Sequence, residues 1–316
     1  MSPQGLAAHT IHRCHTHLGW DRSIEPVQFA KSGERLLVEC KDAAGGHFTD
    51  KSTLDDIATL RPECANPVTG PVFVEGADPG DALVVHIEAF VPSGFGWTAI
   101  LPGFGLLADQ FPNPALKLWQ YETSALQPAV YSDLAQVPLK PFVGTIGVAP
   151  QDPGPHSIIP PRRVGGNMDI RDLSAGATLY LPVEVPGALL SIGDTHAAQG
   201  DGEVCGTAIE SAMDVVVSLE VLKGGAPPFP RFTVPGPVTN YLDKHGYEVT
   251  TGIGPDLGSA ARDSVSGMIE HLTRITSMSA DDAYMLCSVC GDLRISEIVD
   301  APNWVVSFYF PRIVLG

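Results

Sequence analysis

Glycine and proline interrupt this chain at short intervals, and this constrains its fold more than any other feature of the sequence. The 316 residues include 33 glycines and 28 prolines, which favour turns over the interiors of helices and strands. Between these breaks lie short alternating runs, such as residues 32–40 (SGERLLVEC) and 82–90 (ALVVHIEAF), a pattern typical of strands. The sequence therefore predicts a mainly β fold with sandwich-like or barrel-like sheets.

The hydrophobic pattern changes period near the carboxyl terminus. Val265, Met268 and Leu272 fall at helical spacing. A second helix is expected to begin at Ser279, whose hydroxyl can cap its first turn, and residues 303–310 (NWVVSFYF) are typical of a final strand. We therefore expect a β-rich body over residues 1–250, which would hold any catalytic site. A small α+β cap over residues 251–316 would pack on it to form one compact unit.

Charge and hydropathy exclude several classes of partner. The formal net charge is −17, from 19 basic and 36 acidic residues, and so negative a surface repels nucleic-acid phosphates and anionic lipids. No apolar run reaches the length of a membrane span, and the start (MSPQGLAAH) lacks the basic and apolar parts of a secretion signal. We expect no nucleic-acid or membrane partner, and a cytoplasmic location.

The six cysteines are spread thinly over the chain, which is not the pattern of a disulfide framework. Cys287 and Cys290 lie three apart in a helical pattern, without a second such pair to complete a zinc site. We expect both to be small buried side chains on one face of a helix.

Residues 92–141 carry a looser pattern than the rest of the chain. Phe95, Trp97 and Phe104 alternate there with glycines. Long irregular segments of this kind often form lids or pocket walls, and an ordinary packed surface loop is the alternative interpretation.

The densest group of ionisable residues lies in residues 193–203 (GDTHAAQGDGE). An apolar run enters this segment as a strand, and residues two apart in a strand point to the same face, so Asp194 and His196 should project together. Asp201 and Glu203 repeat that spacing across a glycine. These residues could bind a divalent metal, zinc being the usual ion for mixed nitrogen and oxygen ligands. They could also form a metal-free general base with its orienting partner, or a polar turn.

Three further positions carry polar groups with more than one interpretation. Asn167 and Asp169 lie two apart after a pair of glycines that permits close approach of the backbone. Glu39 ends a predicted strand, where a charge that faces water is the simplest interpretation. Glu210 could orient a ligand, although a charge on a strand face is the simpler account.

The central segment continues into residues 205–210 (CGTAIE) and resembles the signature of the acetamidase/formamidase family, amidohydrolases that release ammonia from small amides. Other segments resemble that family in the same order, so that together they cover most of the chain: residues 66–81 (NPVTGPVFVEGADPGD), 144–150 (GTIGVAP), 165–169 (GGNMD) and 291–296 (GDLRIS). The resemblance implies that Glu39 is an active-site acid or base. One departure stands out, because Val164 occupies the place of a histidine that usually precedes the Gly-Gly-Asn motif in the family. The nearby His156 could substitute for it.

The chemistry implied is hydrolysis of a small linear amide by metal-activated water. Asp194, His196 and Asp169 would hold the metal, and Glu203 or Glu39 would move protons, with Asp201 as a further catalytic carboxylate. Asn167 and Gln199 are suited to hold the carbonyl oxygen or the amide nitrogen. The interpretation requires the segment around 194–196 to meet the segment around 167–169 in one cavity.

The alternatives are a related hydrolase of lactams or carbamates and a β protein that binds a small ligand without turnover. We expect no organic cofactor, and association of the chain into a homodimer.

Overall fold

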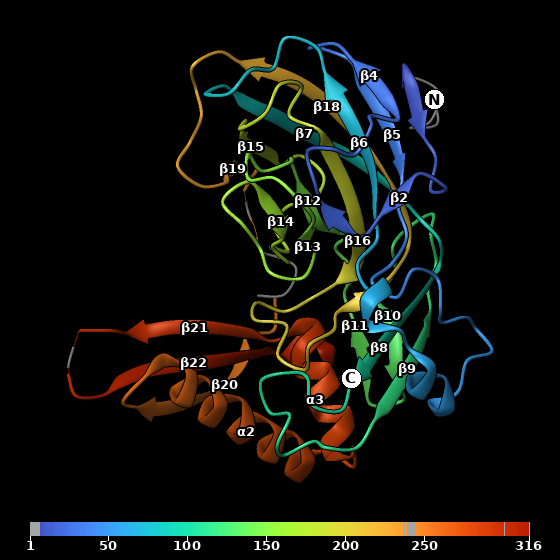
Figure 1. Cartoon of the computed structure of the whole chain (residues 1–316). Coiled ribbons are helices and arrows are strands. Elements are labelled where there is room, and N and C mark those ends of the chain that lie inside the picture. The colour runs from blue at the N-terminus through green and yellow to red at the C-terminus, as the bar shows by residue number, and fades with distance from the viewer. Residues whose placement is uncertain (1–6, 237, 239–243, 300, 316) are drawn as a thin grey trace.

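The computed structural model in Figure 1 describes residues 7–236, 238, 244–299 and 301–315. Most of its elements are strands, which confirms the mainly β prediction. The strands of the amino-terminal half are β1 (His9–Ile11), β2 (Thr16–His17), β3 (Gly19–Trp20), β4 (Gln28–Ala30), β5 (Arg35–Glu39), β6 (Val68–Val74), β7 (Ala82–Pro92), β8 (Phe95–Ile100), β9 (Ala115–Gln120), β10 (Ala129–Ser132), β11 (Ala135–Val137), β12 (Phe142–Gly147) and β13 (His156–Ser157). Those that follow are β14 (Gly165–Asn167), β15 (Thr178–Pro182), β16 (Leu190–Ala198), β17 (Ile209–Glu210), β18 (Met213–Leu222), β19 (Arg231–Thr233), β20 (Tyr247–Gly254), β21 (Asp292–Glu297) and β22 (Trp304–Pro311).

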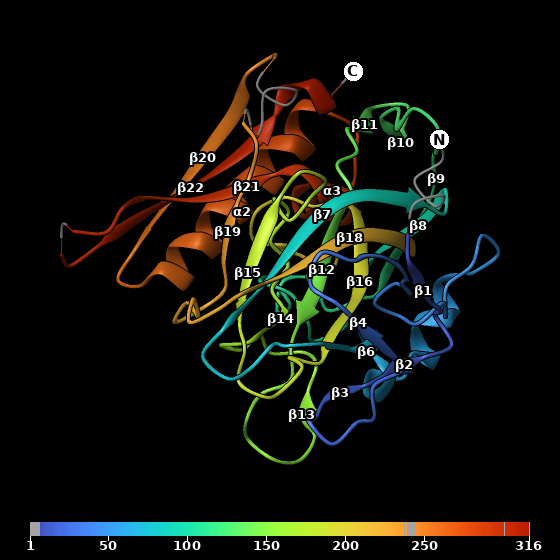
Figure 2. The ribbon, with the colours of Figure 1, turned by 90° about the horizontal axis from the view of Figure 1, so that it is seen from above.

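Two large sheets form the body of the molecule. Among the described strands, the first sheet has the order β1-β5-β18-β7-β15-β19, and its longest pairing joins β18 to β7. The second runs β14-β12-β16-β17-β8-β9, with β6 also paired to β16. Figure 2 shows β7 and β18 crossing over β12 and β16, which is the arrangement of a sandwich.

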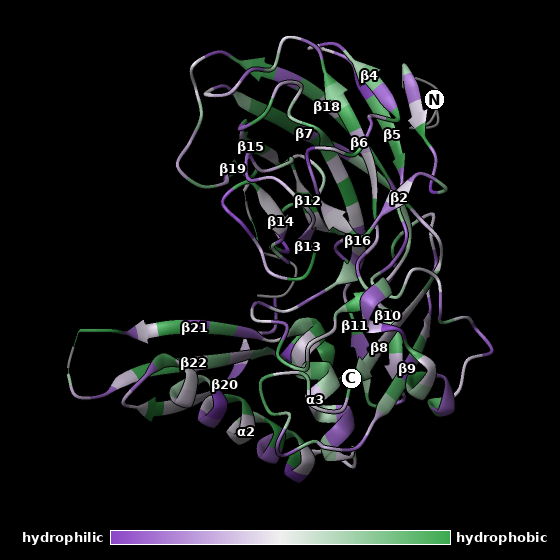
Figure 3. Cartoon of the chain, viewed as in Figure 1, coloured by the Kyte–Doolittle hydropathy of each residue, from purple (hydrophilic) through white to green (hydrophobic). Residues whose placement is uncertain are grey.

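The core between these two sheets is made by alternate residues of their strands. Val215, Val217 and Leu219 of β18 are fully buried and pack in one cluster with Leu190 and Ile192 of β16. Figure 3 shows the corresponding apolar stretches along β7 and β18. The regular alternation of β16 ends beyond Ile192, because Asp194 has a φ of 49° and is not extended.

Residues 92–141 contain strands β8 to β11, so the segment is more regular than the sequence suggested, although most of its residues lie outside these strands. β8 pairs with β17 and β9 in the second sheet. The glycines among its aromatic residues mark close backbone contacts: a Cβ at Gly96 would lie 2.8 Å from the carbonyl oxygen of Glu210. The interpretation as a pocket wall is supported, because Trp97 and Phe104 line the cavity of the candidate site.

A third sheet and two helices make up the carboxyl-terminal portion. β20, β22 and β21 are antiparallel neighbours, with α2 (Leu257–Ile275) packed against β20 and β22. α3 (Ala280–Cys290) begins at Ser279, whose hydroxyl accepts the amide of Asp282 at 3.1 Å, as predicted. Cys287 and Cys290 are buried in α3 with free thiols. The proposed boundary at residue 250 stays a prediction. Within the described ranges, no helix has both the length and the apolar character needed to cross a membrane.

A buried ion pair ties this portion to the body. Arg171 binds the carboxylate of Asp292 through both terminal nitrogens, one of them at 2.8 Å, and both side chains are buried. The same carboxylate accepts the amide of Asp201 at 3.2 Å, and the amide of Gly200 donates to the carbonyl of Ser288 at 2.8 Å. The loop that follows β16 is therefore held by the end of α3 and the start of β21.

Asp292→Ala is expected to lower the free energy of unfolding by about 3 kcal/mol, because it removes the carboxylate that both terminal nitrogens of the buried Arg171 guanidinium bind. Urea unfolding would measure this loss. Asp109→Ala removes an exposed carboxylate from its pair with Arg262 and should change stability little. Equal losses in the two variants would contradict the role given to the buried pair.

Candidate active site

Asp194 and His196 project from β16 into one buried space, as their spacing predicted. Oδ1 of Asp194 lies 3.0 Å from Nε2 of His196, and both side chains are almost fully buried. The edge of the His196 ring faces the ring of Phe142 with centroids 4.8 Å apart. The imidazole is thus held between an aromatic wall and a carboxylate.

Asn167 and Asp169 reach the same space from across β12. In the ladder, Thr145 of β12 lies opposite both Gly193 and Asn167, so β12 separates the two segments. The missing side chain of Gly144 leaves room for them to meet over that strand, since a Cβ there would lie 2.8 Å from Oδ1 of Asp169 and 3.0 Å from Cε1 of His196. The structure therefore satisfies the spatial condition on which the sequence interpretation depended.

Glu210 belongs to this centre, which sequence reasoning did not establish. It lies on β17 directly opposite His196, and its Oε2 is 3.1 Å from Nε2 of the ring. Its other oxygen accepts the amide of Ala208 at 2.9 Å. Its place in the Cys-Gly-Thr-Ala-Ile-Glu motif was the available signal. The strand pairing that decides its position is not visible in the sequence.

Asn66 is a second residue that sequence reasoning missed. Its Nδ2 donates to Oδ1 of Asn167 at 2.8 Å and to Oδ2 of Asp194 at 2.9 Å. The hydroxyl of Thr145 lies 2.7 Å from the same Asn167 oxygen. Since Oδ1 of Asn167 receives these donors, its amide NH₂ is oriented away from them, and no hydrogen bond from it to another described residue is present.

Gln199 fixes the orientation of His196. Its amide nitrogen donates to the backbone carbonyl of Asp169 at 2.8 Å, so its oxygen faces Nδ1 of His196 at 2.9 Å and accepts from it. This assigns the ring proton to Nδ1 from the hydrogen-bond network. Nε2, between two carboxylates, then needs either a second proton or a cation.

Backbone strain gathers at these residues. Seven non-glycine residues of the described chain have a positive φ, and four of them are Asn66 (51°), Asp169 (50°), Asp194 (49°) and Glu203 (43°). Such conformations cost of order 1–3 kcal/mol each and persist where the surrounding structure imposes them. Asn and Asp tolerate this region better than Glu, so the positive φ of Glu203 is the clearest sign among the four that the surrounding structure imposes the conformation.

Four carboxyl groups share this space with one imidazole, and burial sets their pKa values. Burial, with the nearby charge of Asp194, raises the pKa of Asp169 to about 8, and burial raises the pKa of Glu210 to about 7. Burial and the charge of Asp169 raise the pKa of Glu203 well above its usual value. Burial by itself would raise the pKa of Asp194, but the charge and hydrogen bond of the adjacent His196 imidazolium lower it overall. Burial by itself would lower the pKa of His196, but the Glu210 and Asp194 carboxylates raise it well above its usual value.

The same residues fit a divalent cation. Candidate ligand atoms of Asp169, Asp194 and His196 lie within 4.8 Å of one another, and so do those of His196, Glu203 and Glu210. Oδ1 of Asp169 is buried without a hydrogen-bond donor among the described residues, and Oε2 of Glu210 is buried with Nε2 of His196 at 3.1 Å. Buried carboxylate oxygens around an imidazole nitrogen are a donor set suited to zinc and similar ions.

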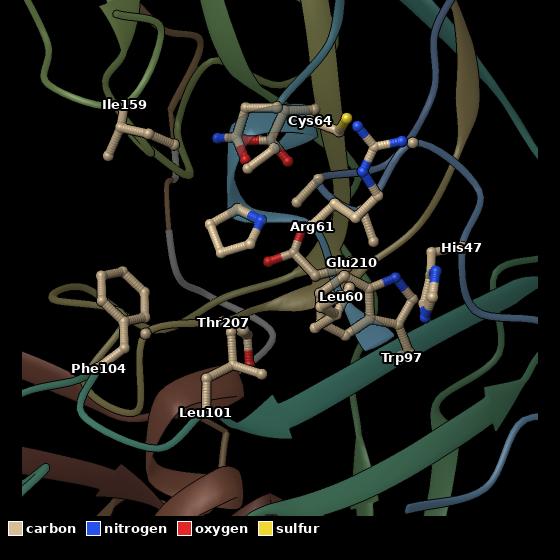
Figure 4. A pocket seen from close by; sticks show the side chains of 18 of the residues that line it. His47, Leu60, Arg61, Cys64, Trp97, Leu101, Phe104, Ile159, Thr207 and Glu210 are labelled. Atoms are coloured by element: carbon tan, nitrogen blue, oxygen red, sulfur yellow. The ribbon is translucent and has the colours of Figure 1, made fainter. Parts of the chain in front are cut away.

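The cluster forms the polar part of a cavity of about 730 Å³. Asn167, Asp169, Asp194, Glu203 and Glu210 all line it. Figure 4 shows Glu210 pointing into the cavity, with Trp97 and Leu60 on one side and Phe104 and Ile159 on the other. Substrate could therefore reach the charged groups from an apolar chamber.

Two predicted catalytic residues lie outside this centre. Glu39 ends β5 in the other sheet, where it lies 3.3 Å from His12 and accepts the amide of Arg13 at 3.2 Å. The side chain of Asp201 is 51% exposed and pairs with Arg171 at 3.3 Å. Neither lines the cavity. The structure thus places both in ion pairs away from the reacting groups.

Val164, which stands where the family usually has a histidine, leaves no gap in the site. Val164 is buried in the core between the two sheets, with Ile146, Val148 and Leu181. His156 is a partly exposed residue of β13 whose ring lies 3.1 Å from the carbonyl of Asp152. Neither residue is among those that line the cavity.

Comparison with known proteins decides the family. The model of the acetamidase/formamidase family matches residues 7–158 and 152–315. The chain belongs to the acetamidase/formamidase family. Membership makes it a hydrolase that acts on carbon–nitrogen bonds in linear amides, and sets aside the alternative of a binding protein without activity.

Individual relatives agree with this family. The chain is 28% identical to the formamidase of Methylophilus methylotrophus, over 93% of this chain and 88% of the relative. Among solved structures, a gamma lactamase from Delftia acidovorans is 25% identical with a TM-score of 0.89, over 98% of this chain and 93% of that one. An acetamidase from Bacillus halodurans is 32% identical with a TM-score of 0.68, over 96% and 97%.

Gly144→Ala is expected to lower hydrolytic activity roughly hundredfold, the scale of loss when reacting groups are displaced by about 1 Å. The added methyl group would collide with Asp169 and with the backbone of Asp194. Gly236→Ala is the matched control, since a Cβ there meets nothing within 4 Å. Steady-state kinetics of both variants would test the packing, and an unaffected Gly144→Ala enzyme would contradict it.

Proposed function

We propose that this protein hydrolyses a primary carboxamide to a carboxylate and ammonia, in the family's manner, at the cluster around His196. The observation that carries the proposal is the position of the cluster: Asp194, His196 and Glu210 are buried, and the carboxyl groups of Asp169, Asp194, Glu203 and Glu210 line one cavity. Glu39 and Asp201 are left out of this mechanism because they lie elsewhere.

Asp194, His196 and Asp169 would hold a divalent cation, and zinc fits the mixed nitrogen and oxygen donors best. When bound, such an ion supplies Lewis-acid chemistry and lowers the pKa of a water molecule toward about 7. Gln199 supports this arrangement from behind, because its contact with Nδ1 of His196 directs Nε2 toward Asp194. In this proposal Gln199 positions the ligand and does not contact the substrate.

Glu203 is the proposed proton carrier. It lines the cavity at the end of the loop from β16, and burial together with the charge of Asp169 raises its pKa well above the usual value, which favours a carboxyl group that can hold a proton and return it. It would take a proton from the attacking water and give it to the departing nitrogen as the carbon–nitrogen bond breaks, so that ammonia leaves and a carboxylic acid remains, which then ionises to the carboxylate.

Asn167 is the proposed donor to the amide carbonyl. Asn66 and Thr145 supply donors to its oxygen, which leaves its NH₂ group facing the cavity. A fixed amide donor stabilises the negative charge that develops on the carbonyl oxygen, without adding a charge of its own.

Metal content tests the cation. Elemental analysis should find a divalent metal in the purified protein, and chelation should abolish ammonia release. Asp194→Ala should lose metal and activity together. Asp78→Ala, which removes an exposed carboxylate paired with Lys223, should retain both. Full activity in a rigorously metal-free preparation would instead leave the carboxylates to act directly.

Glu203→Gln separates proton transfer from ion binding. We expect kcat to fall by roughly 10²–10⁴-fold, the usual contribution of a general acid or base, while the metal content stays unchanged. Kinetics with ammonia detection and elemental analysis of the same sample would check this. Loss of the metal together with activity would make Glu203 a ligand instead of a proton carrier.

A second candidate is hydrolysis of a γ-lactam, favoured by the similarity to the gamma lactamase of Delftia acidovorans. Ring opening retains the nitrogen in the product, so a lactam yields an amino acid where a linear amide yields ammonia. Assaying both products with both substrates distinguishes the two reactions. Zinc, the cytoplasmic location and the homodimer remain predictions of the sequence.

A further inference from the structure

The cavity over the cluster is much larger than a one- or two-carbon amide requires. Its volume of about 730 Å³ equals that of roughly two dozen liquid water molecules at about 30 Å³ each. Formamide has only three non-hydrogen atoms. A cavity of this size lies within the range of about 300–1,000 Å³ typical of sites for drug-sized ligands, so a minimal amide would leave most of it to water.

The walls beyond the charged end are apolar on both sides. The buried Trp97 and the neighbouring Leu60 lie on one side, and Phe104 and Ile159 lie opposite in Figure 4. Phe104 is 51% exposed and Ile159 43% exposed. Large apolar side chains that face each other across a cavity gain free energy when an apolar group fills the space between them.

This wall is held in place by the loop that carries Glu203. A Cβ at Gly206 would lie 2.5 Å from the ring of Phe104, so that ring packs directly on the Gly206 backbone. The amide of Leu106 donates to the carbonyl of Val204 at 2.9 Å. Opposite, Trp97 packs on Phe48 with ring centroids 4.6 Å apart. The distance between the apolar walls and the reacting groups is therefore fixed before a substrate binds.

The charge at the rim favours a neutral substrate. Arg61 lines the cavity, but its guanidinium pairs with Glu63 at 2.9 Å. The site cluster itself is rich in carboxylates. An anionic substituent would therefore meet a compensated cation at the rim and repulsion deeper in.

We propose that the substrate is a neutral primary amide whose acyl group carries an apolar body about the size of a six-membered ring, held between Trp97 and Phe104. The inference rests on the proposed function. Because that reaction releases ammonia, the nitrogen carries no substituent, and the apolar body must belong to the acyl side. Phe104 is then a specificity-determining residue for the reaction.

A substrate series tests this assignment. Ammonia release is measured for formamide, acetamide, butyramide, hexanamide, benzamide and phenylacetamide with the protein as purified. We expect kcat/KM to rise by roughly two- to fourfold for each methylene buried between the walls, so that phenylacetamide exceeds acetamide at least tenfold. The highest kcat/KM with formamide or acetamide would overturn the proposal.

The Phe104→Ala variant tests whether Phe104 contacts the acyl group of the substrate. It should lower the phenylacetamide-to-acetamide ratio of kcat/KM at least fivefold. Phe229→Ala removes an equally large ring that is 65% exposed and outside the cavity, and should leave the ratio unchanged. A Phe104→Ala enzyme that loses the same factor on every amide would refute a role in specificity.

Calorimetry separates failure of this inference from failure of the proposed function. If no amide releases ammonia, the proposed function fails. Binding of phenylacetamide with a negative heat-capacity change, weakened by Phe104→Ala, would still support the apolar chamber. Absence of such binding would overturn it. If acetamide is hydrolysed without a gain for larger acyl groups, only the inference on substrate size fails.

Discussion

Four carboxyl groups and one imidazole occupy the same buried space in this protein, and their mutual repulsion is the constraint to which the surrounding structure responds. Two unit charges 4 Å apart interact by about 4 kcal/mol at an effective dielectric constant of 20. With Asp169, Asp194, Glu203 and Glu210 all ionised, a single His196 imidazolium would leave three negative charges uncompensated. The cluster must therefore hold protons or a cation. The raised pKa values of Asp169 and Glu210, and the buried Oδ1 of Asp169 that accepts no hydrogen bond from a described residue, are expressions of that excess.

The fold keeps these groups together by supporting each from a different direction. The ladders place β12 and β17 on either side of β16, so that Asn167 and Glu210 converge on the residues of β16. Asn66, Thr145 and Gln199 fix the orientations with hydrogen bonds. The Arg171–Asp292 pair then anchors the loop of Glu203 to the carboxyl-terminal portion. The strained backbone at four site residues is maintained by this support.

Apolar surroundings complete the site. The chamber walls come from β8, from the loop after it and from residues 57–60. Phe104 packs on Gly206, in the loop that carries Glu203, and Trp97 packs on Phe48, so both walls are supported by contacts within the protein. A preformed apolar chamber requires little reorganisation when a substrate binds. More of the binding free energy can therefore position the amide carbon at the reacting groups.

The sequence by itself determined the mainly β fold, the two carboxyl-terminal helices, the family and the meeting of Asp194 with His196. The fold class and the helices follow from local patterns, since turn residues, strand alternation and helical spacing act over a few residues, and the family follows from its motifs. Asp194 and His196 do meet, although the positive φ of Asp194 departs from the extended chain that the prediction assumed. Tertiary structure decided the rest. Glu39 ends a strand of the other sheet, and Asp201 diverges from Glu203 because Gly202, at a φ of 107°, breaks the alternation assumed for an extended chain. Glu210 and Asn66 enter the site through strand register and long-range hydrogen bonds, which depend on how distant segments pair and which no local pattern encodes.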